Sequence, residues 1–193
     1  MPKNTVKTTL KLKEYDDTLL EIGIDEAGRG PLWGPLTAAA VLLPTDQTKF
    51  STTYRELLPN IQDSKKISEK KRITIANAIK EHAISYGIGM VGPEEIDSLG
   101  ATRANQLAFR RALEELYNKN SELKKTNLRI LVDGILPLND CSEMEICKTI
   151  VDGDATLVSI AAASILAKTE HDKWVVEWCS QHPADAAKYD LLA

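Results

Sequence analysis

Residues 22–30 read IGIDEAGRG, an apolar run that ends in two adjacent carboxylates and a glycine-flanked arginine. An apolar run of this length before a glycine-rich turn predicts a strand that ends at the rim of a sheet, with Asp25 and Glu26 at that rim. Carboxylates in this position can bind a hard cation such as Mg²⁺. Gly28 and Gly30 let backbone N–H groups approach an anion, and Arg29 adds a fork of donors suited to phosphate. The stretch indicates phosphodiester chemistry, although each of its parts also occurs on ordinary surfaces.

The totals fit one globular domain. A chain of 193 residues can bury one sizeable core, and its 43% hydrophobic and 27% charged residues are ordinary values. The formal net charge of −4 argues against a non-specific nucleic-acid coat protein, because such proteins carry a broad basic field. An acidic total still permits a polyanionic substrate, since metal ligands are acidic and basic residues can be concentrated locally.

The cysteines and the N-terminus indicate where the chain works. Cys141, Cys147 and Cys179 have neither the spacing nor the neighbouring histidines of a zinc site, and their odd number predicts reduced thiols in an intracellular protein. No apolar signal core opens the chain, and no stretch approaches the ~20 apolar residues that span a bilayer. We therefore expect a cytoplasmic protein with no membrane partner.

Hydrophobic periodicity predicts an α/β domain whose sheet is covered by helices on both faces. Strands are expected in the opening run and at residues 36–43, 83–91, 128–132 and 144–151. Helices are expected at residues 68–82, 101–118 and 159–178, with a short helical turn that opens at Pro93. Residues 1–17 are expected to be a flexible lead-in that could include an edge strand near residues 9–12, residues 45–60 a connector, and residues 180–193 a tail without a clear element.

A basic cluster surrounds the start of the helix predicted at residues 68–82. It consists of Lys65, Lys66, Lys70, Lys71 and Arg72, and Ser68 can cap the helix. One interpretation is a solvated helix start. Cations in a first turn oppose the helix dipole, however, and this favours a face turned toward phosphate.

Further carboxylates follow later apolar runs. Asp133 follows the run at residues 128–132, and Asp152 and Asp154 follow the run at residues 144–151. Strand ends on one side of an α/β sheet form the crevice in which ligands collect, so these acids could hold two divalent cations ~3.5–4 Å apart. Asp133 could also be a turn aspartate and Asp154 a helix cap. Asp172 would lie ~20 Å along the last helix, so we assign it a supporting role such as a salt bridge.

The chain resembles ribonuclease HII, the type 2 ribonuclease H family, in five motifs that occur in the same order. The motifs are DEAGRG at residues 25–30, DSKK at 63–66, VDG at 132–134, GD at 153–154 and SIAAASILAK at 159–168. The resemblance implies a ribonuclease H-like fold over residues 18–179, with a five-stranded mixed β-sheet flanked by α-helices. It also implies endonucleolytic cleavage of RNA in RNA/DNA hybrids, including single ribonucleotides embedded in DNA, which leaves 5′-phosphate and 3′-hydroxyl ends.

The resemblance also implies roles for individual residues. The metal ligands for Mg²⁺ or Mn²⁺, in a two-metal site, would be Asp25, Glu26, Asp133 and Asp154. Gly28, Arg29 and Gly30 would hold the RNA–DNA junction and sense the ribose 2′-hydroxyl, which distinguishes RNA from DNA. The remaining substrate-binding residues would be Lys65, Lys66, Ser164 and Lys168.

Three features depart from the family pattern. The family often has lysine at the position of Asp152 and arginine at the position of His171, which predicts weaker phosphate contacts here. The family also continues past the equivalent of residues 189–192 into a lysine-glycine-tyrosine-glycine segment whose tyrosine packs against the junction sugar, whereas this chain ends at Ala193. We expect either a truncated chain or an altered junction recognition.

The leading hypothesis from the sequence is a monomeric, Mg²⁺- or Mn²⁺-dependent endoribonuclease. Two alternatives stay open at this point. One is a hybrid-binding module whose turnover is impaired because the C-terminal segment is missing, and the other is a structure-specific DNA nuclease on the same fold. A Walker-type nucleotide site is disfavoured, because residues 28–34 lack the Gly-Lys-Ser/Thr ending.

Overall fold

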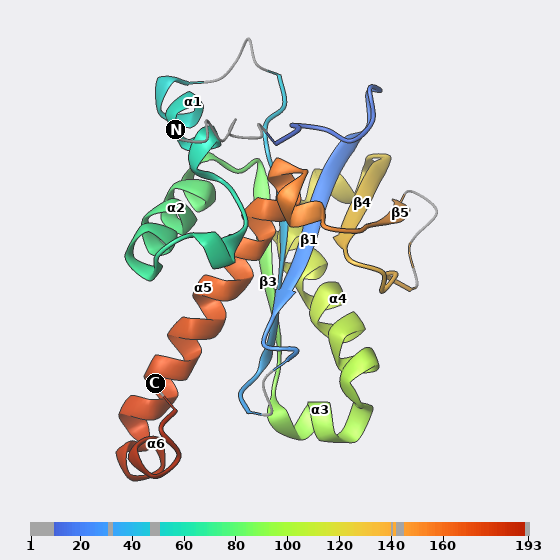
Figure 1. Ribbon diagram of the computed structural model, residues 1–193. Helices are drawn as coiled ribbons and strands as arrows, with labels where there is room; N and C mark the ends of the chain where they lie inside the picture. Colours follow the sequence, from blue (N-terminus) through green and yellow to red (C-terminus); the bar gives the residue numbers. More distant parts are fainter. Residues whose placement is uncertain (1–9, 31–32, 47–50, 140, 142–144, 192–193) are drawn as a thin grey trace, which may run out of the picture.

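A mixed five-stranded sheet lies between two helical layers in the computed structural model (Figure 1), which describes residues 10–30, 33–46, 51–139, 141 and 145–191. The strands are β1 (Leu20–Ala27), β2 (Leu36–Leu42), β3 (Ser85–Val91), β4 (Leu128–Asp133) and β5 (Glu145–Ile150). Their order in the sheet is β3-β2-β1-β4-β5. β2 is antiparallel to β1 and β3, and β4 is parallel to β1 and β5. The predicted five-stranded mixed sheet is confirmed.

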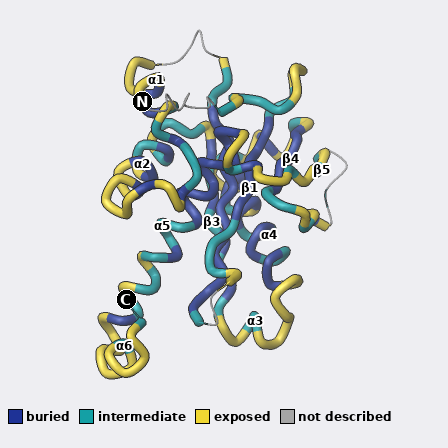
Figure 2. Tube along the Cα trace, viewed as in Figure 1, coloured by how far each residue is buried: buried dark blue, intermediate teal, exposed yellow. Residues whose placement is uncertain are grey.

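The three main helices lie where periodicity places them. They are α2 (Glu69–His82), α4 (Ala101–Lys119) and α5 (Val158–Gln181), and the predicted helical turn at Pro93 is α3 (Pro93–Leu99). Short 3-10 turns form η2 (Leu58–Asn60), η3 (Ser64–Lys66), η4 (Ser121–Lys125) and η5 (Gly153–Ala155). Figure 2 shows that burial is concentrated in the sheet, in α4 and in the first half of α5, whereas α3 and α6 (Pro183–Tyr189) are exposed.

Two segments expected to lack a clear element are helical. Residues 45–60 contain α1 (Thr52–Leu57), which Ser51 caps by accepting a 3.1 Å hydrogen bond from the Tyr54 backbone N–H. The tail contains α6, which Pro183 opens at a position suited to proline. Each helix has fewer than eight residues, too short for a helical period to emerge from the sequence.

The lead-in adds no strand to the sheet within its described part. Lys11 forms an isolated parallel bridge with Leu157, and its backbone N–H donates to the Thr156 carbonyl over 2.9 Å. The edge strand expected near residues 9–12 is therefore wrong for residues 10–12, because this segment pairs with the approach to α5 instead. Residue 9 lies outside the described residues, as does Met144 at the start of the fifth predicted strand.

Successive β1 side chains point to opposite faces of the sheet, as strand geometry requires. Ile22 and Ile24 pack with α4 in one core cluster, while Ala39 and Val41 of β2 pack with α2 and α5 in another. Figure 1 shows α4 on one side of the strands and α2 with α5 on the other. The side chains of Ile22, Ile24 and Glu26 alternate along β1 and therefore share the face that α4 covers. Asp25 points to the opposite face, which α5 covers.

The first turn of α5 packs directly on β1 at Gly23. A Cβ atom added there would lie 2.3 Å from the Ser159 carbonyl carbon, so only glycine fits. This backbone contact brings the start of α5, and with it η5, close to the middle of β1. It is the contact that places the Asp154 segment beside the strand that carries Asp25.

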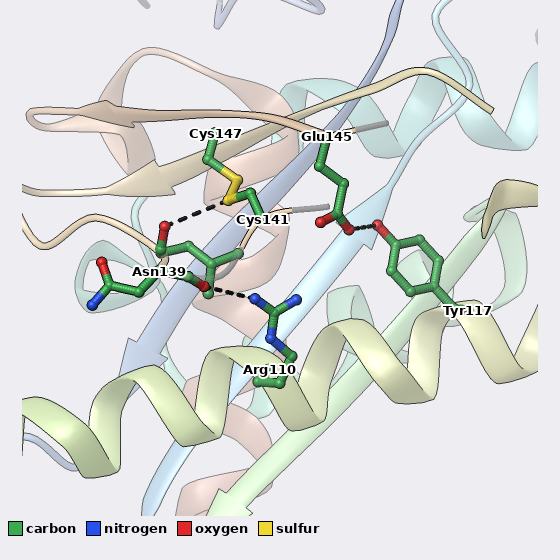
Figure 3. Close-up of a disulfide and its surroundings, with 7 residues drawn as sticks. Arg110, Tyr117, Asn139, Cys141, Glu145 and Cys147 are labelled. Atoms are coloured by element: carbon green, nitrogen blue, oxygen red, sulfur yellow. Dashed lines mark hydrogen bonds between the residues drawn. A yellow bond between two sulfur atoms is a disulfide. The ribbon is translucent and has the colours of Figure 1, made fainter. Parts of the chain in front are cut away.

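The prediction of three reduced thiols is wrong for two of them. Cys141 and Cys147 form a disulfide with a Cα–Cα distance of 6.6 Å (Figure 3), while Cys179 is a buried free thiol as expected. The chain returns on itself between β4 and β5, which brings two cysteines six residues apart into contact. An odd count of cysteines carries no information about such a local pair. Among the helices of the described parts of the chain, none is long and apolar enough to cross a membrane.

Candidate active site

The predicted metal ligands gather where β1 and β4 end. These strands are parallel, and Ile24 of β1 is level with Val132 of β4, so Asp25 and Asp133 follow at adjacent positions. Asp133 also holds the turn before α5, because its Oδ1 accepts a 2.7 Å hydrogen bond from the Gly153 N–H and a 3.4 Å hydrogen bond from the Asp154 N–H. The end of β4 thus connects the β1 acids to the Asp154 turn.

Asp25 is the most buried of these acids, with 7% of its surface exposed. Burial, followed by the negative charge of Asp133, raises the pKa of Asp25 to about 8. The Ser164 hydroxyl and the Glu26 backbone N–H, which donates to Oδ1 over 2.7 Å, act in the opposite direction and lower the pKa of Asp25. Asp25 is therefore a carboxyl group that takes up its negative charge readily only when a nearby positive charge compensates it.

Glu26 and Asp154 share this character. Burial raises the pKa of Glu26, and Arg29 opposes the shift with its Nη1 3.6 Å from Glu26 Oε1. Burial likewise raises the pKa of Asp154, where Asp133 adds to the shift while Lys65 and Lys66 oppose it. The charge of Asp133 contributes to the raised pKa of all three neighbours, so each of them lies within electrostatic reach of Asp133.

This donor set fits a hard divalent cation. It offers carboxylate oxygens only, the ligands that Mg²⁺ and Mn²⁺ prefer, and their mutual repulsion would be relieved by a positive charge. Among the residues that the structure describes, however, no group of three or more His, Cys, Asp or Glu side chains has the arrangement of a preformed metal site.

The glycine-rich turn after β1 is supported by aromatic side chains of α5. Gly28 has φ +85°, and an added Cβ would lie 2.3 Å from the Pro35 carbonyl oxygen, which excludes other residues. Trp33 packs on Trp174 and Trp178, with ring centroids 5.7 and 4.9 Å away. No described residue lies within 4 Å of a Cβ added at Gly30, so as far as the described chain goes this part of the turn is open to a ligand. The aromatic support was missed in the sequence, although a tryptophan within the turn was the available signal.

The DSKK segment is connected to Asp25 through buried polar groups. The hydroxyls of Ser64 and Ser164 lie 3.0 Å apart, and the Ser164 hydroxyl lowers the pKa of Asp25. Arg72 donates from Nη1 to the Ser64 carbonyl over 3.3 Å and from Nη2 to Asp172 Oδ2 over 2.7 Å. The salt-bridge role predicted for Asp172 is confirmed.

Arg72 differs from expectation, and Lys168 has a partner within the chain. Arg72 is only 8% exposed, so the interpretation of the whole cluster as a solvated or phosphate-facing surface is wrong for this residue. Lys168 pairs with Asp172 over 2.6 Å, one helical turn further along α5. Lys65 and Lys66 are exposed beside Asp63, with Lys66 Nζ 3.3 Å from Asp63 Oδ2. The predicted substrate contacts of Ser164 and Lys168 stay predictions, now with internal partners known for both side chains.

Comparison with known proteins places the chain in a family. The sequence pattern of the ribonuclease HII family matches residues 22–189. The chain belongs to the ribonuclease HII family. It is 46% identical over 157 residues to ribonuclease HII of Porphyromonas gingivalis, covering 81% of this chain and 69% of that protein. It is 40% identical over 185 residues to ribonuclease HII of Caldanaerobacter subterraneus subsp. tengcongensis, covering 92% of this chain and 68% of that protein.

Solved structures support the ribonuclease H-like fold. Ribonuclease H2 from Pyrococcus horikoshii OT3 superposes with a TM-score of 0.60 at 21% identity, covering 85% of this chain and 77% of that chain. The Mn²⁺ complex of Bst-RNase HIII superposes with a TM-score of 0.66 at 23% identity, covering 84% of this chain and 55% of that chain. At these identities the likeness concerns the fold, and it confirms the fold expected from the sequence for this ribonuclease HII family member.

Proposed function

We propose that this chain cleaves the RNA strand of RNA/DNA hybrids, including ribonucleotides embedded in DNA, through a site built on Asp25, Glu26, Asp133 and Asp154. Membership of the ribonuclease HII family makes it an endoribonuclease that acts on RNA/DNA hybrids. The observation that carries the site assignment is the gathering of three acids with raised pKa values around Asp133. Family membership favours neither the binding-only module nor the DNA nuclease.

The four acids would hold two divalent cations, Mg²⁺ or Mn²⁺. When bound, such cations activate water for in-line attack and neutralise the charge that develops on the phosphate and the leaving oxygen. The Mn²⁺ complex of Bst-RNase HIII supports this choice of cation for the fold. Cleavage would leave 5′-phosphate and 3′-hydroxyl ends.

The chain's own residues would orient the substrate around these acids. The open Gly30 side of the turn offers backbone N–H groups to a phosphate or a ribose 2′-hydroxyl, and the half-exposed Arg29 guanidinium lies beside Glu26. Exposed Lys65 and Lys66 on η3 lie close enough to Asp154 to affect its pKa, so they can contact the backbone of a strand that reaches the acids. The arrangement provides cation ligands on one side and anion-binding groups on the other.

A panel of labelled duplexes tests the proposal. The chain is incubated with Mn²⁺ or Mg²⁺ and an RNA/DNA hybrid, a DNA duplex with one ribonucleotide, or an all-DNA duplex. We expect cleavage of the first two only, with 3′-hydroxyl products. Binding without cleavage would support the hybrid-binding module, and cleavage of all-DNA would support the DNA nuclease. Gel filtration in parallel tests the expected monomer.

A further inference from the structure

Asn105 is a fully buried amide in an apolar layer. It lies on α4 with 0% of its surface exposed, next to Ala104 and one turn before Ala108 and Phe109 of the core. Neither Nδ2 nor Oδ1 has a hydrogen-bond partner among the residues that the structure describes. An amide buried in this way costs free energy of folding, because its hydrogen bonds with water are lost without replacement. An apolar side chain of similar size would pack there at a lower cost.

The position of Asn105 places it beside Glu26. Across the sheet, Glu26 of β1 is level with Ala38 of β2, which is level with Gly89 of β3. A Cβ added at Gly89 would lie 2.0 Å from the Ala108 carbonyl oxygen, so α4 crosses this row of residues at Ala108. Asn105 is one helical turn from that crossing.

The direction along α4 is also fixed. Gly87, earlier on β3, contacts the Ala112 carbonyl in the same way, so α4 runs antiparallel to β3. Asn105 therefore lies beyond the crossing, toward the strand ends where the acids gather. Glu26 points to this α4 side of the sheet, and the Asn105 amide interacts with its carboxylate. The contact falls outside hydrogen-bonding geometry in this structure.

We propose that Asn105 is a positioning residue for Glu26, whose Nδ2–H group donates to one carboxylate oxygen and leaves the other oxygen directed toward the cation site. This inference rests on the proposed function. It explains why a polar side chain occupies a core position where no other described residue satisfies it.

The test compares stability with cation affinity in Asn105→Leu. This variant keeps the approximate volume and removes both polar atoms. We expect the melting temperature without metal to be unchanged or raised by a few degrees, because the unsatisfied amide is gone. We expect the Kd for Mn²⁺, measured by calorimetry, to rise about tenfold and kcat on an RNA/DNA hybrid to fall about tenfold, with KM little changed. Gln106→Leu, a neighbouring polar-to-apolar change on the same helix, is the matched control and should alter neither Mn²⁺ affinity nor kcat.

If Asn105 only stabilised the fold, the variant would lose stability and keep its Mn²⁺ affinity and kcat. If Asn105→Leu lowers the melting temperature while Mn²⁺ affinity and kcat stay at the wild-type values, the inference is wrong. Should this variant fail to fold, Asn105→Ala provides the same comparison of affinity and turnover. If the wild-type chain binds Mn²⁺ and cleaves the hybrid, and Asn105→Leu is equally active, only this inference is overturned. A wild-type chain that does neither overturns the proposed function as well.

Discussion

Asp25 and Glu26 are adjacent on β1, yet the two faces of the sheet hold them in different ways. On the α5 side, the Ser164 hydroxyl lowers the pKa of Asp25 and lies 3.0 Å from the Ser64 hydroxyl. On the α4 side, Glu26 lies against an apolar layer that contains the unsatisfied amide of Asn105, and its charged partner is the half-exposed Arg29, 3.6 Å away. The comparison teaches that the polar partners of Asp25 are buried in the fold, whereas the charged partner of Glu26 is half-exposed and leaves that side freer to adjust.

The charge of Asp133 acts on both Asp25 and Glu26, so replacing Asp133 should have the largest effect on cleavage. Asp133→Asn nearly preserves the shape of the side chain but removes the charge that acts on Asp25, Glu26 and Asp154. We expect kcat for metal-dependent cleavage to fall about 10³-fold, in the range of lost electrostatic contributions in other enzymes. The Gly153 N–H can still donate to the amide oxygen, so the melting temperature should change little. Full activity in a folded Asp133→Asn protein contradicts the ligand assignment.

The pH dependence of the free energy of unfolding should report on the buried carboxyl group of Asp25. Asp25 has a pKa of about 8 in the folded chain, raised from 3.8, so between these values the folded state binds a proton that the unfolded state lacks. The free energy of unfolding without metal should therefore fall as pH rises from 5 to 7, by about 1 kcal/mol per pH unit from this group. Denaturant titrations at several pH values measure the slope. Asp25→Asn should flatten it, and an unchanged slope in that variant would show that another group is responsible.

Replacing Arg72 tests whether the polar groups on the Asp25 side of the sheet contribute to the stability of the fold. Arg72→Met keeps much of the aliphatic packing but removes the donors to the Ser64 carbonyl and to Asp172. We expect a loss of about 2 kcal/mol in the free energy of unfolding, since charge-assisted hydrogen bonds from a buried guanidinium are broken. The exposed neighbour in Lys71→Met is the control and should cost much less. Equal losses in the two variants would argue against the network.

The smallest effect concerns the Ser64–Ser164 hydroxyl pair. A double-mutant cycle with Ser64→Ala, Ser164→Ala and the double variant isolates the coupling between them. We expect a coupling free energy of about 1 kcal/mol, the contribution of one buried hydrogen bond, from chemical denaturation. A coupling near zero would mean that the two hydroxyls are satisfied independently, and the Asp25 side would then be no more constrained than the Glu26 side.

The sequence was sufficient for the sheet and for the location of the acids, because both depend on local patterns. Apolar runs that end in Asp25 and Asp133 predicted strands and rim carboxylates, and the two strands prove to be parallel neighbours. The long helices were predictable because their apolar positions repeat over several turns. The short helices α1 and α6 were not, since their starts depend on single capping residues rather than on a period.

What the sequence could not provide was the partner of each polar side chain. Arg72 was assigned to a basic surface, and only the packing of α2 against α5 buries it beside Asp172. Asn105 lies within a helix with an ordinary apolar stripe, and its relation to Glu26 arises from how α4 crosses the sheet. The Cys141–Cys147 bond likewise follows from the path between β4 and β5. These contacts join residues through tertiary geometry, which a one-dimensional pattern does not encode.

The contact of Gly23 with Ser159 has a consequence for how the site tolerates change. Two backbones touch there, so the spacing between β1 and the start of α5 is set by atoms that are the same in every amino acid. Substitutions elsewhere in the core can alter volume and rotamers without changing this distance. The distance between Asp25 and the Asp154 turn should therefore stay nearly constant when core residues are substituted. As long as position 23 is glycine, the rest of the core can change in sequence without displacing these acids.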